Sequence, residues 1–239
     1  ACMVNPCRDL KLTAIVGPQE PPKQRIALGA EELRNFLREL HRMPRNYELA
    51  VRLMLLTGVR INTIAEAKKE EFKPKFAVWE IPHERRKNRR HTTGPFVIPL
   101  PAQAVEWVRE LLNLADRDEY LLPVNPIRGA GIRNPLSKRT TIAGWIDRVR
   151  TDSGGTWQRI TPHDLRSTCK TWLSELRVDY ETRQRYLDHS LDSAVDAIYD
   201  KADYREHRLA AANKWLGFLF DLEAGKALEN VVNLHGASR

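Results

Sequence analysis

The spacing of apolar residues divides the chain into a series of amphipathic helices, interrupted once by strand-like segments. The first helix is marked by apolar residues at three- and four-residue intervals, at Leu33, Phe36, Leu37 and Leu40. The strongly apolar segment from about Tyr47 to Thr57 predicts a buried helix, and Gly58 is suited to end it. A short third helix is predicted from Ile61 to Ala65.

The pattern then changes from helical to strand-like. Phe76–Ile81 and Phe96–Leu100 are short runs rich in aromatic and β-branched residues, and the segment between them, residues 85–91, is very basic. We therefore predict a β-hairpin with a basic tip. The remaining apolar periodicity predicts helices at about 102–115, 139–150, 163–175, 180–187, 191–199 and 205–222. The predicted fold class is mainly α with a small antiparallel β-sheet.

The two ends of the chain differ from this helical body. Residues 1–28 hold four of the fourteen prolines without sustained periodicity, so we interpret them as a linker from an upstream core-binding domain that is missing here. The main domain is predicted over 29–221, followed by a tail over 222–239. The chain shows no signal peptide and no apolar run of the roughly 18–20 residues that a membrane span needs, which favours a cytoplasmic protein without a membrane partner.

Charge and cysteine content narrow the function classes. The formal net charge of +8 suits a polyanionic partner such as DNA, although a well-solvated basic protein has the same composition. Three scattered cysteines, Cys2, Cys7 and Cys169, form neither a disulfide framework nor a zinc-site pattern.

The segment Thr161-Pro-His-Asp-Leu-Arg166 carries the first chemical signal. Thr161 can cap a helix and Pro162 suits its first turn, so His163 and Arg166 share one face near the helix N-terminus. A guanidinium group and an imidazole beside a helix N-terminus are suited to bind a phosphate and to transfer a proton beside it. The alternative is a capped surface helix with an incidental histidine.

Further candidates are weak when taken singly. Arg60 follows a helix-ending glycine, Lys87 is one of several basic residues on the hairpin, and His189 and Tyr199 stand ten residues apart around one short helix. Each has an ordinary structural explanation: a surface arginine, a solvated charge run, an amphipathic tyrosine.

Taken together and in order, these segments resemble the tyrosine recombinase (phage integrase) family over roughly residues 25–220. The stretches 79–90, 97–100 and 199–204 are most similar to integrases of prophages and genomic islands. The matching motifs are Thr57-Gly-Val-Arg60, the hairpin Lys87, His163-Asp-Leu-Arg166, His189-Ser190 and Tyr199. Two positions depart from the usual pattern: Thr63 stands where many members have an acidic residue, and Asp188 replaces the usual glycine before the histidine.

The resemblance implies an enzyme that cuts and rejoins DNA through a 3′-phosphotyrosine at Tyr199, leaving a free 5′-hydroxyl. Arg60 and Arg166 would neutralise the phosphate in the transition state. No cofactor or metal is expected, because the bond energy is conserved in the covalent intermediate and side chains supply the positive charge. Two alternatives stay open: a type IB topoisomerase-like enzyme that relaxes DNA, and a non-catalytic DNA-binding protein derived from a recombinase.

The resemblance also assigns the proton-transfer residues and the partners. His163 would act as general base, Lys87 would protonate the leaving 5′-oxygen, and His189 would hydrogen-bond the scissile phosphate. The partner would be double-stranded DNA at attachment sites, bound by a homotetramer that is a monomer without DNA. The tail from about residue 222 would either dock on a neighbouring protomer or be mobile without DNA, and the alternative is that it completes the core of its own domain. The neighbours of Lys87 are expected to bind DNA phosphates without a role in the chemistry: Arg85, Arg86, Arg89 and Arg90.

Overall fold

The computed structural model describes residues 25–87, 94–115, 119–123, 137–189 and 204–226. The helices are α2 (Ala30–Glu39), α3 (Arg45–Thr57), α4 (Ile61–Ala65), α5 (Ala102–Leu114), α6 (Ser137–Asp152), α7 (Pro162–Glu175), α8 (Tyr180–Tyr186) and α10 (Arg205–Glu223). Short 3-10 helices lie at Leu40–Arg42, Lys69–Glu71, Pro74–Phe76 and His83–Arg85. The strands are β1 (Phe72–Lys73), β2 (Val78–Ile81) and β3 (Phe96–Pro99).

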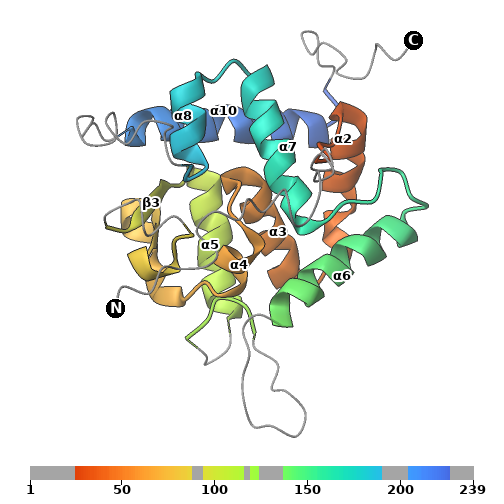
Figure 1. The fold of residues 1–239 in the computed structure, drawn as a ribbon. Coiled ribbons are helices and arrows are strands. Elements are labelled where there is room, and N and C mark those ends of the chain that lie inside the picture. The colour runs from red at the N-terminus through yellow and green to blue at the C-terminus, as the bar shows by residue number, and fades with distance from the viewer. Residues whose placement is uncertain (1–24, 88–93, 116–118, 124–136, 190–203, 227–239) are drawn as a thin grey trace, which may run out of the picture.

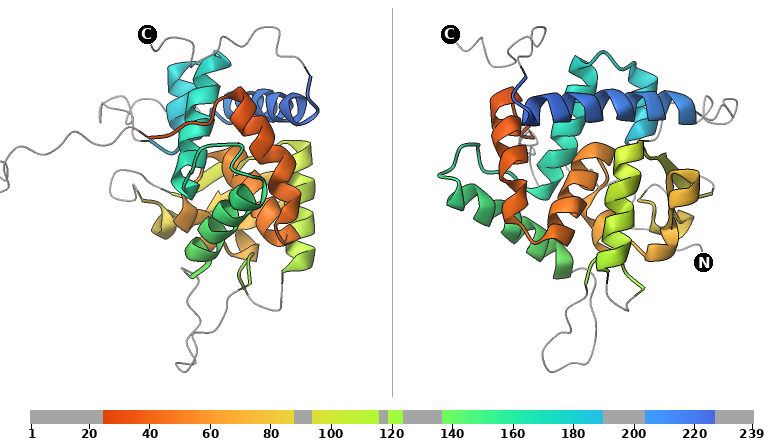
Figure 2. Two further views of the ribbon diagram at one scale, coloured as in Figure 1. Left: turned by 90° about the vertical axis from the view of Figure 1, so that its right-hand side faces the viewer. Right: turned by 180° about the vertical axis from the view of Figure 1, so that it is seen from behind.

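Helix α3 forms the centre of the fold. Its side chains from Tyr47 to Thr57 are buried with the exception of Arg52, and it packs against α5, α6, α7 and α10. In Figure 1, α7 and α8 lie above α3 and α4, and in the view from behind in Figure 2 the blue helix α10 runs across the top of the molecule. Burial on every side explains why this segment is apolar all round rather than along one stripe.

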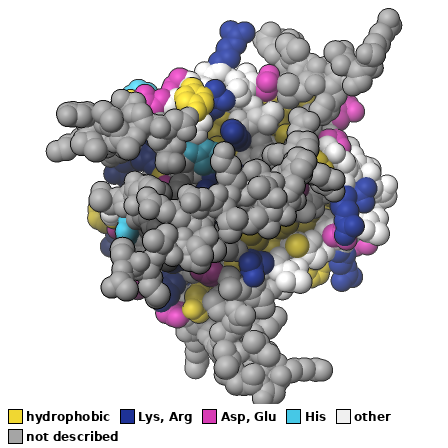
Figure 3. Space-filling view, viewed as in Figure 1, with side chains coloured by type: hydrophobic (Ala, Val, Ile, Leu, Met, Phe, Trp, Pro, Cys, Tyr) yellow, Lys and Arg dark blue, Asp and Glu magenta, His cyan; other side chains and the backbone are white. Residues whose placement is uncertain are grey.

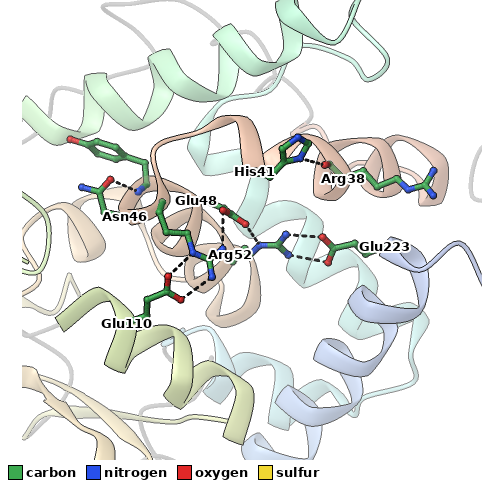
Figure 4. Close-up of polar contacts among 9 residues, drawn as sticks. Arg38, His41, Asn46, Glu48, Arg52, Glu110 and Glu223 are labelled. Atoms are coloured by element: carbon green, nitrogen blue, oxygen red, sulfur yellow. Dashed lines mark hydrogen bonds and ion pairs between the residues drawn. The ribbon is translucent and has the colours of Figure 1, made fainter. Parts of the chain in front are cut away.

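Ion pairs connect α3 with α5 and with α10 (Figure 4). Arg45 donates two hydrogen bonds to Glu110 of α5, at 2.7 and 2.8 Å. Arg52 donates two to Glu223 of α10, at 3.0 and 2.7 Å, and a third to the buried Glu48 at 3.0 Å. Bidentate contacts between arginine and a carboxylate hold the two side chains in a defined relative orientation, in addition to pairing their charges.

The sheet is antiparallel, with β2 between β1 and β3. Trp79 of β2 is opposite Phe72 on one side and Ile98 on the other. The predicted pairing of two strands into a hairpin is confirmed, but the strand begins at Val78 rather than Phe76. The reason is local: Pro74–Phe76 form a 3-10 turn, and Ala77 has a left-handed φ of 51°, which interrupts extended backbone.

The packed body extends past both predicted boundaries. Leu28, the last residue of the predicted linker, is 1% exposed; its N–H donates to Thr168 Oγ1 at 3.1 Å and its carbonyl accepts from Trp172 Nε1 at 2.9 Å. Leu222, assigned to the tail, is fully buried and precedes the paired Glu223. The helix predicted at 191–199 lies outside the described residues. Among the helices that are described, none is long and apolar enough to cross a membrane.

Candidate active site

A cleft of about 670 Å³ opens between α4, the β2–β3 hairpin and the adjoining ends of α7 and α8. Of the predicted site residues, Arg60, Arg85, Arg86, Lys87 and Arg166 line it. Tyr199, Arg89 and Arg90 lie outside the described residues. The other lining residues are Thr57, Val59, Asn62, Thr63, Glu66, Ile81, Glu84, Phe96, Tyr186, Leu187 and Asp188.

Arg166 is held from both ends of its guanidinium group. Nη1 donates to the carbonyl of Gly58 and Nη2 to the carbonyl of Leu187, each at 2.6 Å, and the residue is 7% exposed. Gly58 has the left-handed φ of 62° that ends α3, and a Cβ there would lie 2.5 Å from Cδ2 of Leu187. Glycine therefore permits the close approach that brings its carbonyl to Arg166.

Two like charges, those of Arg60 and Arg166, lie near each other in the cleft. Burial and the nearby charge of Arg60 lower the pKa of Arg166 to about 10. Burial likewise lowers the pKa of Arg60, and the carboxylate of Asp188 acts in the opposite direction. Burial disfavours the charged forms of these two neighbouring guanidinium groups, and a bound anion would stabilise them.

His163 lies at the start of α7, as predicted. The cap is built by Asp164, whose Oδ2 accepts from the N–H of Thr161 at 2.8 Å and from its hydroxyl at 2.6 Å. Burial, followed by the charges of Arg25 and Arg166, lowers the pKa of His163 below its usual value. The imidazole is therefore neutral at pH 7 and available as a proton acceptor.

His189 follows α8 and is fixed by Gln184. Its Nδ1 lies 2.7 Å from Oε1 of Gln184, and because that oxygen only accepts, Nδ1 carries the proton. Burial and the charges of Arg166, Lys170 and Arg60 lower the pKa of His189 to about 4. In the absence of DNA, Nε2 of His189 is thus unprotonated at neutral pH.

Arg85 is bonded within the protein. Its Nη1 pairs with Glu71, which is 2% exposed and also accepts from Trp79 Nε1 at 3.0 Å, while its Nη2 donates to the carbonyl of Thr63 at 2.5 Å. These contacts connect the base of the hairpin to α4 and to the 3-10 helix before β1. Sequence reasoning missed Glu71, because one glutamate in a charged segment carries no mark of burial.

Arg86 is also directed inward. Its Nη2 donates to Oδ1 of Asp188 at 2.5 Å, its Nη1 donates to the carbonyl of Gly94 at 3.0 Å, and its guanidinium lies 5.6 Å from the ring centroid of Phe96. Lys87, the next residue, is exposed at the cleft. The prediction that Arg85 and Arg86 bind DNA phosphates stays a prediction, but both side chains already have a structural task.

Basic side chains also occur away from the cleft. Figure 3 shows Lys and Arg side chains on several parts of one face of the molecule, with acidic side chains interspersed. Surface charge spread in this way suits contacts to a polyanion backbone that do not read sequence.

The chain is similar to several known proteins. The model of the phage integrase family matches residues 27–206. The chain is 27% identical over 174 residues to the prophage integrase IntA of Escherichia coli K12, and 27% identical over 138 residues to the tyrosine recombinase XerC of Chlamydia pneumoniae. The matches cover 72% and 58% of this chain, but the chain spans only 38% and 41% of those relatives.

Solved structures share the fold. The integrase from mycobacterium phage Brujita superposes with a TM-score of 0.60 at 18% identity, covering 84% of this chain and 62% of that protein. A lambda integrase dimer bound to a COC′ core site gives a TM-score of 0.54 at 21% identity, covering 78% of this chain and 51% of that one. At these identities the likeness shows the fold alone.

Proposed function

The chain belongs to the phage integrase family, and from that premise we propose that it is the catalytic part of a site-specific DNA recombinase, which cleaves and rejoins strands through a 3′-phosphotyrosyl bond at Tyr199. The observation that carries the proposal is the pair of arginines that line the cleft, Arg60 and Arg166. Burial, together with the charges of these arginines, lowers the pKa of His163 and of His189. That the related lambda integrase is described as bound to a core site supports double-stranded DNA as the partner.

The two arginines suit the electrostatic demand of phosphodiester cleavage. Attack on phosphorus places extra negative charge on the non-bridging oxygens, and preorganised cations in a partly buried cleft stabilise that charge more than water does. Arg166 needs no rearrangement to do so, since its guanidinium is already fixed by the carbonyls of Gly58 and Leu187.

The proton transfers follow from the remaining side chains. The phenolic oxygen of Tyr199 bonds to phosphorus while its proton passes to the neutral His163. The bond from phosphorus to the 5′-oxygen breaks, and Lys87 gives that oxygen a proton. The products are a 3′-phosphotyrosine and a free 5′-hydroxyl. Attack by a 5′-hydroxyl of the partner strand reverses the same steps, so the strands are rejoined without an external energy source.

Tyr204 has a packed ring, which makes it an unsuitable candidate for the nucleophile. Tyr204 lies directly before α10, and the guanidinium of Arg185 is 4.1 Å from its ring centroid. The ring centroids of Tyr204 and His207 are 5.5 Å apart. A ring packed in this way serves as an anchor for the start of the helix. We therefore assign the covalent bond to Tyr199.

Trapping the covalent intermediate tests the proposal. The full-length protein is incubated with a duplex of the element's attachment site that is nicked beside the cleavage position, so that the short 5′-hydroxyl fragment is lost and the adduct accumulates. Peptide mapping should place the DNA on Tyr199. An adduct on Tyr204 would overturn the assignment, and the absence of any adduct would favour a non-catalytic DNA-binding protein. Relaxation of a supercoiled plasmid without recombination would favour the topoisomerase alternative.

DNA binding is expected to take up a proton at His189. A phosphate beside Nε2 favours the protonated imidazole, so the bound pKa lies above the free value of about 4. Affinity should therefore rise as pH falls below the bound-state pKa and level off near pH 4, by at most about tenfold per pH unit for one proton. Fluorescence anisotropy between pH 8 and pH 5 measures this slope.

The matched control separates this proton from the general effect of acid. In a His189→Gln variant the slope should be smaller than in the wild type, whereas His41→Gln, an exposed histidine whose Nδ1 meets the carbonyl of Arg38, should leave it unchanged. Equal slopes in all three proteins would show that His189 takes up no proton on binding.

A further inference from the structure

Asp188 has an unusual backbone position for a residue with a side chain. It stands in the turn after α8 with a left-handed φ of 51°, which glycine adopts freely and which aspartate and asparagine tolerate better than other residues. Its side chain is only 12% exposed and accepts the 2.5 Å hydrogen bond from Arg86, a residue 102 positions away. A carboxylate kept at a position suited to glycine indicates a task for that carboxylate.

The partner of Asp188 organises the loop that carries Lys87. Arg86 is 9% exposed in its side chain and closes the 3-10 turn through its N–H, which donates to the carbonyl of His83 at 3.1 Å. Together with its contacts to Gly94 and Phe96, it joins the two sides of the hairpin to each other. Because Arg86 directly precedes Lys87, these contacts restrict the backbone position from which the Lys87 side chain projects.

The other side of Asp188 holds the phosphate-binding residues. Leu187, immediately before it, accepts the hydrogen bond from Arg166, and the N–H of His189, immediately after it, donates to the carbonyl of Gln184 at 3.0 Å. The carboxylate also favours the charged forms of Arg60 and Arg166. The turn at Asp188 thus links Arg60, Arg166 and His189 to the ion pair between Asp188 and Arg86.

We propose that Asp188 is a positioning residue: through its ion pair with Arg86, it holds the Lys87 loop against the turn that carries His189, so that the leaving-group acid is aligned with the phosphate site before DNA binds. The inference rests on the proposed function for its catalytic consequence, but the coupling of the two segments is a property of the unbound protein. Because both side chains are largely shielded from water, the pair is screened less than a surface ion pair.

The proposal also relates the two departures from the family pattern. Thr63 and Asp188 line the same cleft. The acidic side chain absent at Thr63 is thus matched by an acidic side chain that enters the cleft from the end of α8. In this chain Asp188 supplies negative charge near Arg60 and also holds the hairpin through its ion pair with Arg86.

Hydrogen exchange tests the coupling without requiring any activity. Asp188→Asn keeps the shape and the tolerance of positive φ but removes the charge, and Asp188→Gly also relieves the backbone, so that both should fold. Each should raise amide exchange in the hairpin peptide that covers residues 81–87, and Arg86→Gln should raise exchange in the peptide that covers 184–189. Glu106→Gln, which removes an exposed carboxylate paired with Arg109, is the control and should alter neither peptide. Unchanged exchange in the Asp188 and Arg86 variants would overturn the proposal.

Cleavage kinetics test the consequence. In single-turnover reactions on the phosphodiester substrate at saturating protein, Asp188→Asn and Arg86→Gln should each slow cleavage about tenfold, and the double variant should be no slower than either. Only Asp188→Asn is expected to leave DNA affinity nearly unchanged, because Arg86 is itself a predicted phosphate contact. A substrate with a 5′-bridging sulfur, whose leaving group needs no proton, should remove most of the defect.

A defect of equal size on both substrates, or additive losses in the double variant, would show that Asp188 does not act through Lys87. If the wild type forms no covalent adduct, the proposed function fails, and the exchange measurement still decides whether the ion pair couples the two segments.

Discussion

Replacement of Arg166 by alanine is expected to slow strand cleavage at least a hundredfold while leaving DNA affinity nearly unchanged. Loss of one transition-state charge contact costs about 3 kcal/mol or more, which corresponds to that factor in rate. Binding is distributed over many phosphate contacts, so removal of one cation should reduce the salt dependence of affinity by at most about one unit of slope. Single-turnover cleavage and anisotropy at several salt concentrations measure the two effects separately.

The buried position of Arg166 requires a control for folding. Alanine leaves the carbonyls of Gly58 and Leu187 without their donor, so the thermal unfolding midpoint is measured alongside the rate. Arg166→Lys keeps the charge but cannot reach both carbonyls and a phosphate with one ammonium group, and it should also be slow. Arg109→Ala, an exposed arginine of α5, should cleave normally. A folded Arg166→Ala protein that cleaves near the wild-type rate would show that the site has been assigned incorrectly.

The helical body could be predicted from the sequence because its apolar periodicity is strong. The predicted bounds of α3, α5, α7 and α10 lie within two residues of those observed, and Gly58 ends α3 in the left-handed conformation that its position suggested. The hydrogen bond from Arg166 to the carbonyl of Gly58 could not be predicted in this way, because the two residues are 108 positions apart. No local pattern encodes that contact, and the prediction that Arg60 and Arg166 share a site came from the order of motifs.

The environment of the basic hairpin could not be predicted. A run of lysines and arginines has the composition of a solvated surface, whereas Arg85 and Arg86 bond inward to partners 14 and 102 positions away. Which charges pair is decided by tertiary packing, because every arginine in such a run has the same local sequence signal. The burial of Leu28 and Leu222 was not visible in the sequence for the same reason, because both become core residues through contacts with distant helices.

Replacement of Lys87 by alanine is expected to slow cleavage of a normal phosphodiester about a hundredfold, and a 5′-bridging sulfur should restore the rate. General acids contribute at least about this factor when the leaving group is a poor one. An alkoxide must be protonated as it leaves, whereas a thiolate, with a pKa near 8.5, leaves without a proton. Lys87 is exposed at the cleft directly after the anchored Arg86, so its removal should disturb neither the fold nor the affinity for DNA.

Two companion variants distinguish proton donation from charge. Lys87→Arg keeps the positive charge, but a guanidinium does not give up its proton at neutral pH, so this variant should remain slow on oxygen and recover on sulfur. Lys75→Ala, an exposed lysine before β2, should behave as the wild type on both substrates. If Lys87→Arg cleaves the phosphodiester normally, charge alone suffices at this position. If sulfur fails to restore Lys87→Ala, another group protonates the leaving oxygen, and Lys87 instead contributes to binding or to the geometry of the hairpin.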